Sequence, residues 1–445
     1  MNAKTLTQTT DLQAITVRPN MQRTLMISMI SMIALSMGGM SVAAQAQTQQ
    51  QNEIEQLRQE VQALRSLVEQ QKVQNAQTAT AIANVQRTAA TVPANPVLKT
   101  AKGAEFNLYG NMRLDASYKV DGGPIDWPYN QINNVALEGT AGNSDRLSST
   151  LSATRLGLDF KTQASEQEVK GKIEVDFLGG ANFDNLRIRH AYVNYGNWLL
   201  GQTWSNFAVP DYMPETIDAN AYVGGAVKRT PQVRYTTKFN PQTNLVLAAE
   251  DPKDKLVTDK VITQRLPALT ARLNHQFADN LNVSVRAMGH EKRINSEEEM
   301  AWGVGVGAKY DVVPGTTLKA DYYHVKGDSS FVSFANKGVV VEADGSLVQN
   351  EFDSIMLGVT QKFSDKLHGT LGYGYMTFDK DQNYLDAPGS AATANKDLWQ
   401  AWANVFYSPT KPLSFGLEYV YGERETFASK TGEDNRLNAV AIYNF

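Results

Sequence analysis

Beyond residue 105, apolar and polar residues alternate in one segment after another. In residues 435–445, the odd-numbered side chains from Leu437 to Phe445 are apolar or aromatic, whereas the other face begins with Arg436 and Asn438. A period of two that ends on an aromatic residue is typical of a membrane-spanning β-strand. The same pattern recurs along the rest of the chain.

Sixteen such segments follow one another. They cover residues 106–120, 147–160, 168–178, 186–195, 197–203, 230–239, 243–250, 265–277, 281–291, 299–310, 316–326, 351–363, 367–378, 397–408, 413–423 and 433–445. Their connections alternate between short turns and long polar loops, of which 121–146, 204–229, 327–350 and 379–396 are examples. An even strand count with this alternation predicts an all-β fold, a 16-stranded antiparallel transmembrane β-barrel spanning 105–445.

Eight aromatic residues close the strands that run into the short turns. They are Phe160, Tyr195, Phe239, Phe277, Tyr310, Phe363, Tyr407 and Phe445. Aromatic residues at one level predict the girdle of an outer-membrane barrel at the periplasmic interface. A soluble β-sandwich or propeller, the alternative all-β fold, would not place them at one end of every second strand.

The inward phase of the predicted strands is polar, as with Asn107, Arg113 and Asp115 in the first strand, which predicts a water-filled lumen. The inward positions five residues before each girdle aromatic lie about 12 Å from the girdle on a tilted strand, near the middle of the membrane. Arginines occupy this level on the early strands. Later strands carry Gly305, Gly358, Trp402 and Val440 there, and inward glycines are expected to widen the bore.

Seven arginines are predicted to line the pore and bind solute: Arg113, Arg155, Arg189, Arg234, Arg272, Arg286 and Arg436. Strict alternation turns Arg187 and Arg189 outward, so that only a β-bulge brings Arg189 into the pore. Arg436 lies nine residues before the C-terminus. It is expected near the mouth, where it attracts anions rather than selecting them.

Residues 204–229 are too long for an ordinary hairpin loop and carry Asp211, Glu215 and Asp218. These carboxylates are complementary to the inward arginines. We therefore expect the segment to fold into the lumen and narrow the pore, with the acidic loop facing the positive wall. The alternative is a solvated extracellular loop.

The N-terminal region predicts a signal peptide over 1–46, with Met21 as the natural start and Ala44-Gln45-Ala46 as the cleavage site. The alternative is a retained membrane anchor. An a/d heptad pattern from Ile54 to Val85 then predicts a self-associating α-helical coiled coil over 47–88. Its seam alone favours a dimer. The Gln/Glu-rich outer face disfavours a helix lying on a membrane, and 89–104, with two prolines, is a linker.

Composition excludes several functions. The net charge of −4 is too small to indicate nucleic-acid binding, and the absence of cysteine excludes disulfides and thiolate catalysis. The five histidines are scattered, with no H-x-x-H pair and no G-x-S-x-G elbow. We therefore predict no catalytic residues, no metal site and no cofactor, which disfavours an outer-membrane hydrolase. A trimeric adhesin is also disfavoured, because a complete barrel lies in one chain.

Five short segments carry a family resemblance: FNLYG (106–110), TRLG (154–157), VKG (169–171), LRIRHAYV (186–193) and LGQTW (200–204). In this order they resemble the opening strands of trimeric sixteen-stranded porins. The resemblance implies that Arg155 and Arg234 are constriction arginines and that 204–229 is the inward-folded third loop. It also implies that the assembly machinery of the outer membrane recognises the strand ending at Phe445.

The heptad arm ahead of the barrel resembles the DcaP-type subgroup, which is similar to dicarboxylate-uptake channels. This implies a homotrimer, in place of the dimer that the seam favours. It also implies a Gram-negative outer membrane with surrounding lipid and lipopolysaccharide. The arm is expected in the periplasm, where about 50 Å of helix reaches toward peptidoglycan or a periplasmic protein. The predicted function is passive diffusion of small anions, dicarboxylic acids foremost; a phosphate-type or general diffusion porin is the alternative.

Overall fold

The structure of the protein is a computed structural model. It describes residue 62 and residues 98–445, apart from 101–102, 123–126, 130, 141–144, 181–182, 220–222, 253–263, 295, 334 and 388–393. The predicted signal peptide, the coiled coil except Gln62, and the linker up to residue 97 lie outside the described residues. Within the part of the chain that is described, no helix is long and apolar enough to cross a membrane.

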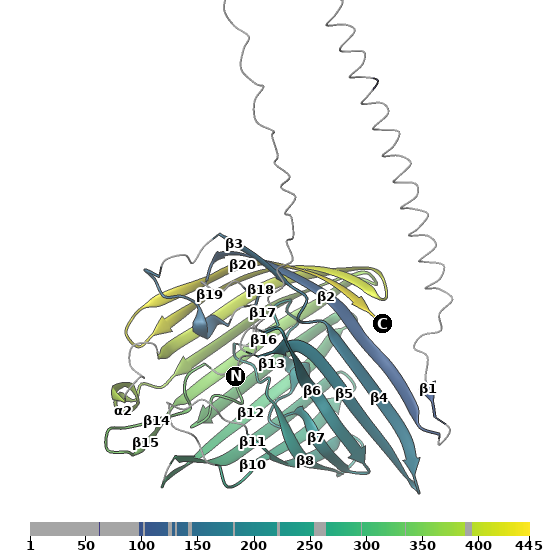
Figure 1. Ribbon diagram of the computed structural model, residues 1–445, viewed down its shortest axis with the longest axis horizontal. Coiled ribbons are helices and arrows are strands. Elements are labelled where there is room, and N and C mark those ends of the chain that lie inside the picture. The colour runs from purple at the N-terminus through teal and green to yellow at the C-terminus, as the bar shows by residue number, and fades with distance from the viewer. Residues whose placement is uncertain are drawn as a thin grey trace, which may run out of the picture. The chain divides into compact units, whose positions relative to one another are not determined.

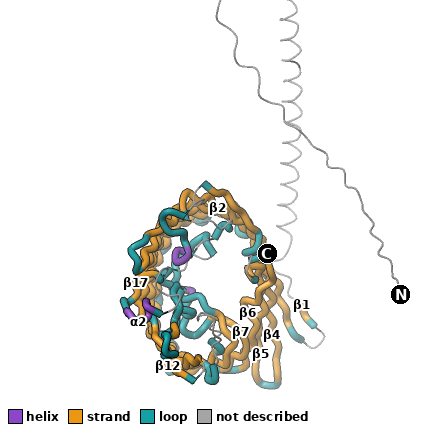
Figure 2. The backbone as a smooth tube through the Cα atoms, turned by 60° about the vertical axis from the view of Figure 1, so that its left-hand side comes forward, coloured by secondary structure: helices purple, strands orange, loops and turns teal. Residues whose placement is uncertain are grey.

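Sixteen antiparallel strands form a closed barrel, which Figures 1 and 2 show from two sides. They are β2 (Glu105–Asp121), β3 with β4 (Arg146–Thr150 and Arg155–Ala164), β5 (Gln167–Gly179), β6 (Asn185–Tyr195), β7 (Trp198–Trp204), β8 (Arg229–Lys238), β9 (Thr243–Glu250), β10 (Ala268–Ala278), β11 (Leu281–Ile294), β12 (Glu297–Val313), β13 (Thr316–Lys326), β16 (Glu351–Ser364), β17 (Leu367–Phe378), β18 (Asn395–Thr410), β19 (Leu413–Thr426) and β20 (Thr431–Asn444). The predicted fold class and strand order are confirmed.

The barrel closes between its first and last strands. β2 pairs with β20 over the register from Asn111↔Asn444 to Asp121↔Asn435. Gly110 also exchanges two backbone hydrogen bonds of 3.0 Å with Phe445. The predicted strand 147–160 is interrupted, because residues 151–154 leave the ladder between β3 and β4. A two-residue strand, β1 (Leu98–Lys99), pairs with the start of β2.

Alternation along the strands separates two faces. Outward side chains such as Leu114, Leu200 and Leu417 are exposed and apolar, as the lipid-facing surface of a barrel requires. Seven of the eight predicted girdle aromatics are likewise exposed. The eighth, Phe160, packs against Phe106 with ring centroids 6.3 Å apart.

The interior of the barrel is partly filled by its loops. Loop residues Phe207, Val223 and Phe331 form one buried cluster with wall residues that include Phe352 and Met376. The outer loops also hold η1 (Ile132–Asn134), the hairpin β14 (Val339–Val341) with β15 (Leu347–Gln349), and α2 (Gln382–Asp386). The core of this protein therefore lies inside the barrel, between the loops and one part of the wall.

Candidate functional site

Loop 3 joins β7 to β8, and its described residues, 205–219 and 223–228, fold back into the barrel as predicted. Figure 2 shows loop segments lying inside the ring of strands. The short 3-10 helix η2 (Pro210–Tyr212) contacts β12 and β13. Phe207, Tyr212, Ile217 and Val223 are each at most 4% exposed, and burial raises the pKa of Tyr212. One side of the loop is thus packed against the wall.

Glycines on the inner face of the wall make room for loop 3. A Cβ atom added at Gly303 or Gly307 of β12 would meet Phe207 or Tyr212 of the loop. One added at Gly358 of β16 would meet Pro214, and one at Gly374 of β17 would meet Val223. The expectation that inward glycines widen the bore is wrong at these four positions, because the loop occupies the space that they leave. At Gly305 the space is taken by Tyr323 of the wall.

The tip of loop 3, residues 215–218, is held by side chains of the wall. The Glu418 carboxylate on β19 accepts hydrogen bonds from Ile217 N at 2.9 Å and from Thr216 Oγ1 at 3.1 Å. Trp402 Nε1 and Asn404 Nδ2 donate to the Glu215 carbonyl at 2.9 and 2.8 Å. The tip therefore has a fixed position against β18 and β19.

A second part of the wall exposes arginines to the lumen. We define the arginine wall as Arg155 on β4 and Arg187 and Arg189 on β6, with Glu174 and Asp176 on β5 between them. Arg189 Nε lies 2.7 Å from Glu174, Arg187 Nη2 lies 2.6 Å from Asp176, and Arg155 Nε lies 3.4 Å from Glu174. The side chains of Arg155 and Arg187 are each 35% exposed. Three cations thus share two carboxylates.

A β-bulge turns Arg189 inward. Glu174 pairs with His190, and the next residue, Val175, pairs with Ile188, so Arg189 has no partner in the ladder. Both Arg189 and His190 consequently point into the barrel, where each is at most 9% exposed. The bulge that the sequence required for Arg189 to face the lumen is present, and it brings in Arg187 as well.

A cavity of about 930 Å³ lies between the arginine wall and loop 3. Six Lys or Arg residues and three Asp or Glu residues line it: Arg113, Arg155, Arg187, Arg189, Lys228, Arg229, Asp176, Glu215 and Asp218. Phe183, Trp204 and Phe406 add apolar surface, and the Arg229 guanidinium lies over the Trp204 ring at 4.3 Å from its centroid. The lining of the cavity is therefore predominantly cationic and partly aromatic.

The seven predicted arginines do not form one group. Arg113, Arg155 and Arg189 line the cavity, although Arg113 also binds Asp115 at 2.7 Å and donates to the Ile217 carbonyl at 2.5 Å. Arg234 and Arg272 lie on β8 and β10, outside the cavity lining. Arg234 donates to Gln232 Oε1 at 2.8 Å.

Arg286 and Arg436 are sealed from the lumen, contrary to expectation. The Arg286 side chain is 0% exposed and pairs with Asp321 on β13, beside Tyr323. The Arg436 side chain is also 0% exposed and pairs with Asp434 and Asp218. Loop 3 lies over both, so Arg436 anchors the loop instead of attracting ions at the mouth.

The three acidic residues of the loop also differ in their exposure and in their partners. Asp218 is 1% exposed and paired with Arg436. Glu215 is half exposed, and one of its carboxylate oxygens lies 2.8 Å from His368 Nε2. Asp211 is exposed on η2. Of the three, only Asp218 meets an inward arginine as predicted.

Sequence reasoning missed Glu174, Asp176 and Glu418. The first two sit at alternate positions with Lys172 along β5, an inward charged run that was visible in the sequence. Glu418 gave no such signal, because three of its five donors belong to residues 216–218, about 200 residues earlier in the chain.

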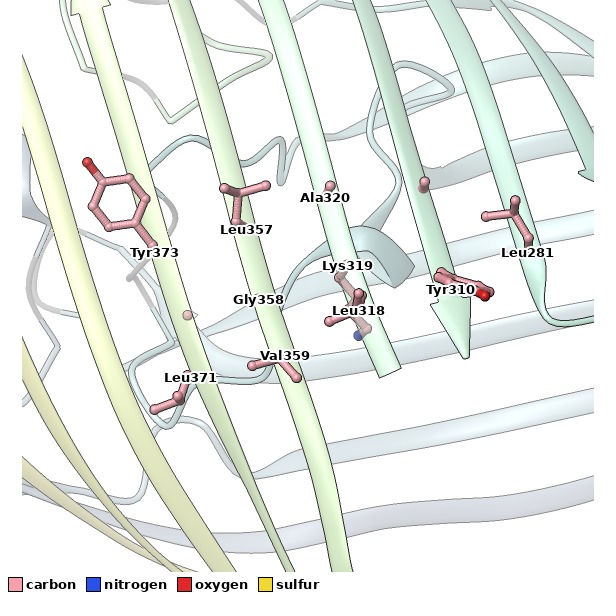
Figure 3. A pocket seen from close by; sticks show the side chains of 12 residues that line it. Leu281, Tyr310, Leu318, Lys319, Ala320, Leu357, Gly358, Val359, Leu371 and Tyr373 are labelled. Atoms are coloured by element: carbon pink, nitrogen blue, oxygen red, sulfur yellow. The ribbon is translucent and has the colours of Figure 1, made fainter. Parts of the chain in front are cut away.

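Hollows also occur on the outer face of the barrel. The one in Figure 3, about 610 Å³, is lined by outward Leu318, Leu357, Leu371 and Tyr373 around the small Ala320. Its walls are apolar and belong to the lipid-facing side of β11 to β17. It lies on the opposite face of the wall from the lumen, and among its described lining residues only Lys319 is charged.

Comparison with known proteins agrees with this architecture. The family model for DcaP outer membrane protein matches residues 39–445. The chain belongs to the DcaP family. No curated protein sequence matches it.

Solved structures support the same assignment. The outer membrane channel DcaP of Acinetobacter baumannii is 38% identical, with a TM-score of 0.72 over 78% of this chain and 99% of that chain. An anion-selective porin from Comamonas acidovorans is 12% identical, with a TM-score of 0.53 over 77% of this chain and 100% of that chain. Salmonella typhi OmpF is 17% identical, with a TM-score of 0.51 over 78% of this chain and 99% of that chain. The last two show the fold alone. This DcaP-family protein is an outer-membrane channel.

Proposed function

We propose that this channel passes small anionic solutes, dicarboxylates foremost, by passive diffusion through an eyelet between the arginine wall and loop 3. The observation that carries the proposal is the cavity of about 930 Å³ lined by six cationic residues and three acidic ones. An excess of cations in a narrow, water-filled passage lowers the barrier for anions and raises it for cations.

The arrangement of the arginines favours carboxylates. A guanidinium binds both oxygens of a carboxylate in its planar fork, whereas an ammonium acts as a point charge. Arg155 and Arg187 come from β4 and β6, strands separated by β5 and therefore by roughly 10 Å. A solute with two carboxylates can engage both, which distinguishes it from a single compact anion.

Release is as important as binding in a channel. Glu174 and Asp176 already hold the arginines at 2.6 to 3.4 Å, so an incoming carboxylate competes with carboxylates of the wall. This competition keeps each contact weak, as conduction requires. Arg234 and Arg272, on the adjoining arc of the wall, add positive potential without lining the cavity.

The proposal is tested by measuring the reversal potential of the purified channel in a planar bilayer under a KCl gradient. We expect the unmodified channel to be anion-selective. In the Arg155→Ala/Arg187→Ala double variant this anion selectivity should be strongly reduced, because the two most exposed guanidiniums of the wall are lost. Arg293→Ala is the matched control, since this arginine lies on the outward phase of β11 and pairs with Glu298 at 3.4 Å.

Liposome swelling then compares succinate, an aromatic dicarboxylate and phosphate. We expect faster uptake of the dicarboxylates and a selective loss of that advantage in the double variant. Cation selectivity of the unmodified channel would refute the proposal. Preference for phosphate would favour a phosphate-type porin, and equal rates a general diffusion porin.

A further inference from the structure

Glu418 is a buried carboxylate on the wall that binds the tip of loop 3. It is 1% exposed on the inner face of β19. Its two oxygens accept hydrogen bonds from Thr216 Oγ1 at 3.1 Å, Ile217 N at 2.9 Å and Asp218 N at 3.3 Å. Three consecutive loop residues therefore wrap around one carboxylate.

The remaining partners of Glu418 are amides. Asn404 Nδ2 and Asn438 Nδ2 each donate to it at 3.1 Å, and within the described residues no Lys or Arg forms an ion pair with Glu418. A buried carboxylate is costly unless its oxygens are hydrogen-bonded. Removing the loop tip would leave this charge with two of its five donors, so the wall itself favours the seated position of the tip.

Contacts on the other side of the tip complete a clamp. Arg113 Nη2 of β2 donates to the Ile217 carbonyl at 2.5 Å, while Glu418 accepts from the N–H of the same residue. Asn404 contacts both Glu418 and the Glu215 carbonyl. The peptide groups of the tip are thereby held in one orientation, with Glu215 and Thr216 along the edge of the cavity.

We propose that Glu418 is a positioning residue that clamps the tip of loop 3 and so sets the width of the eyelet. The inference rests on the proposed constriction but not on its anion preference. Because the wall lies directly behind the tip, a released tip can move only into the lumen. Losing one hydrogen bond to a charged group shifts such an equilibrium by about tenfold or more.

The experiment is single-channel recording of the full chain in symmetric KCl. For Glu418→Ala we expect frequent transitions to lower conductance levels and a reduced mean conductance. Glu418→Gln keeps the shape and one acceptor oxygen, so it should fall between Glu418→Ala and the unmodified channel. Glu423→Ala, which removes the same residue type from the outward phase of β19, should behave as the unmodified channel.

A loop-side variant keeps the proposal testable if Glu418→Ala does not assemble. Thr216→Val removes one donor to Glu418 without changing the barrel wall, and it should give the same transitions less often. The proposal is overturned if Glu418→Ala, folded and resistant to heat in detergent, or failing that Thr216→Val, keeps steady conductance with no added open-channel noise. Reversal potentials from the same bilayers report ion preference separately, so failure of the clamp and failure of the proposed function give different results.

Discussion

Two regions of the barrel wall carry arginines with opposite consequences. On β4 and β6, Arg155 and Arg187 are each 35% exposed to the lumen and share the carboxylates of β5. On β11 and β20, Arg286 and Arg436 are fully buried under loop 3, each with its own carboxylate partners. The residue type and the inward orientation are the same, and only the covering by the loop differs.

This difference shows that function in the channel depends on what loop 3 leaves uncovered. The covered wall is built for packing, with glycines facing loop side chains and buried ion pairs beneath them. The uncovered wall is built for contact with water and solute. A change in the covered wall should therefore affect stability first, and a change in the arginine wall should affect ion selectivity first.

The largest effect is expected at Arg286. Arg286→Leu leaves Asp321 buried and unpaired, and breaking a buried pair in this way costs about 3–5 kcal/mol. We expect a corresponding loss in the free energy of unfolding, measured by urea titration in lipid vesicles. The reversal potential of the channels that do assemble should stay close to that of the unmodified protein.

The double variant Arg286→Leu/Asp321→Leu is the control for this prediction. Replacing both members of a buried pair by apolar residues is often close to neutral, so most of the stability should return. If Arg286→Leu instead changed ion selectivity with little loss of stability, Arg286 would face the lumen and the distinction between the two walls would fail.

A smaller effect is expected from filling the space under the loop. Gly358→Leu places a side chain where Pro214 packs, and overpacking of this kind costs about 1–3 kcal/mol. The displaced loop should narrow the eyelet, which lowers single-channel conductance. Gly289→Leu is the control, because a Cβ at Gly289 meets only Ala301 O at 3.8 Å. Equal conductance in the two variants would show that Gly358 does not seat the loop.

The sequence predicted the barrel well because its signal is local. A period of two identifies each strand independently, so all sixteen strands are found from alternation and turns. The same alternation could place Arg189 only conditionally, since a bulge shifts the phase by one residue. It could not separate Arg155 from Arg286 or Arg436, which share a phase but differ in whether a distant loop covers them. Such covering depends on contacts across some 70 to 220 residues of sequence.

The smallest effect is expected from removing a carboxylate of the arginine wall. Glu174→Gln keeps the side-chain shape and an acceptor for Arg189, but it leaves Arg155, Arg187 and Arg189 with Asp176 as the remaining carboxylate of the wall. One unit charge acting across about 8 Å of water changes the energy of a passing anion by about 0.5 kcal/mol. We therefore expect anion over cation permeability to rise by about twofold.

Reversal potentials in a KCl gradient measure that change, and raising the salt concentration should reduce it, because mobile ions screen the added charge. Glu168→Gln is the matched control on the same strand: its carboxylate lies at the exposed end of β5, paired with Lys161 and Lys170. A shift toward cations, or the same shift in both variants, would mean that solutes do not sense the arginine wall. A shift confined to Glu174→Gln would show that the carboxylates of the arginine wall limit anion selectivity. They do so because they bind the same arginines that a passing anion must bind.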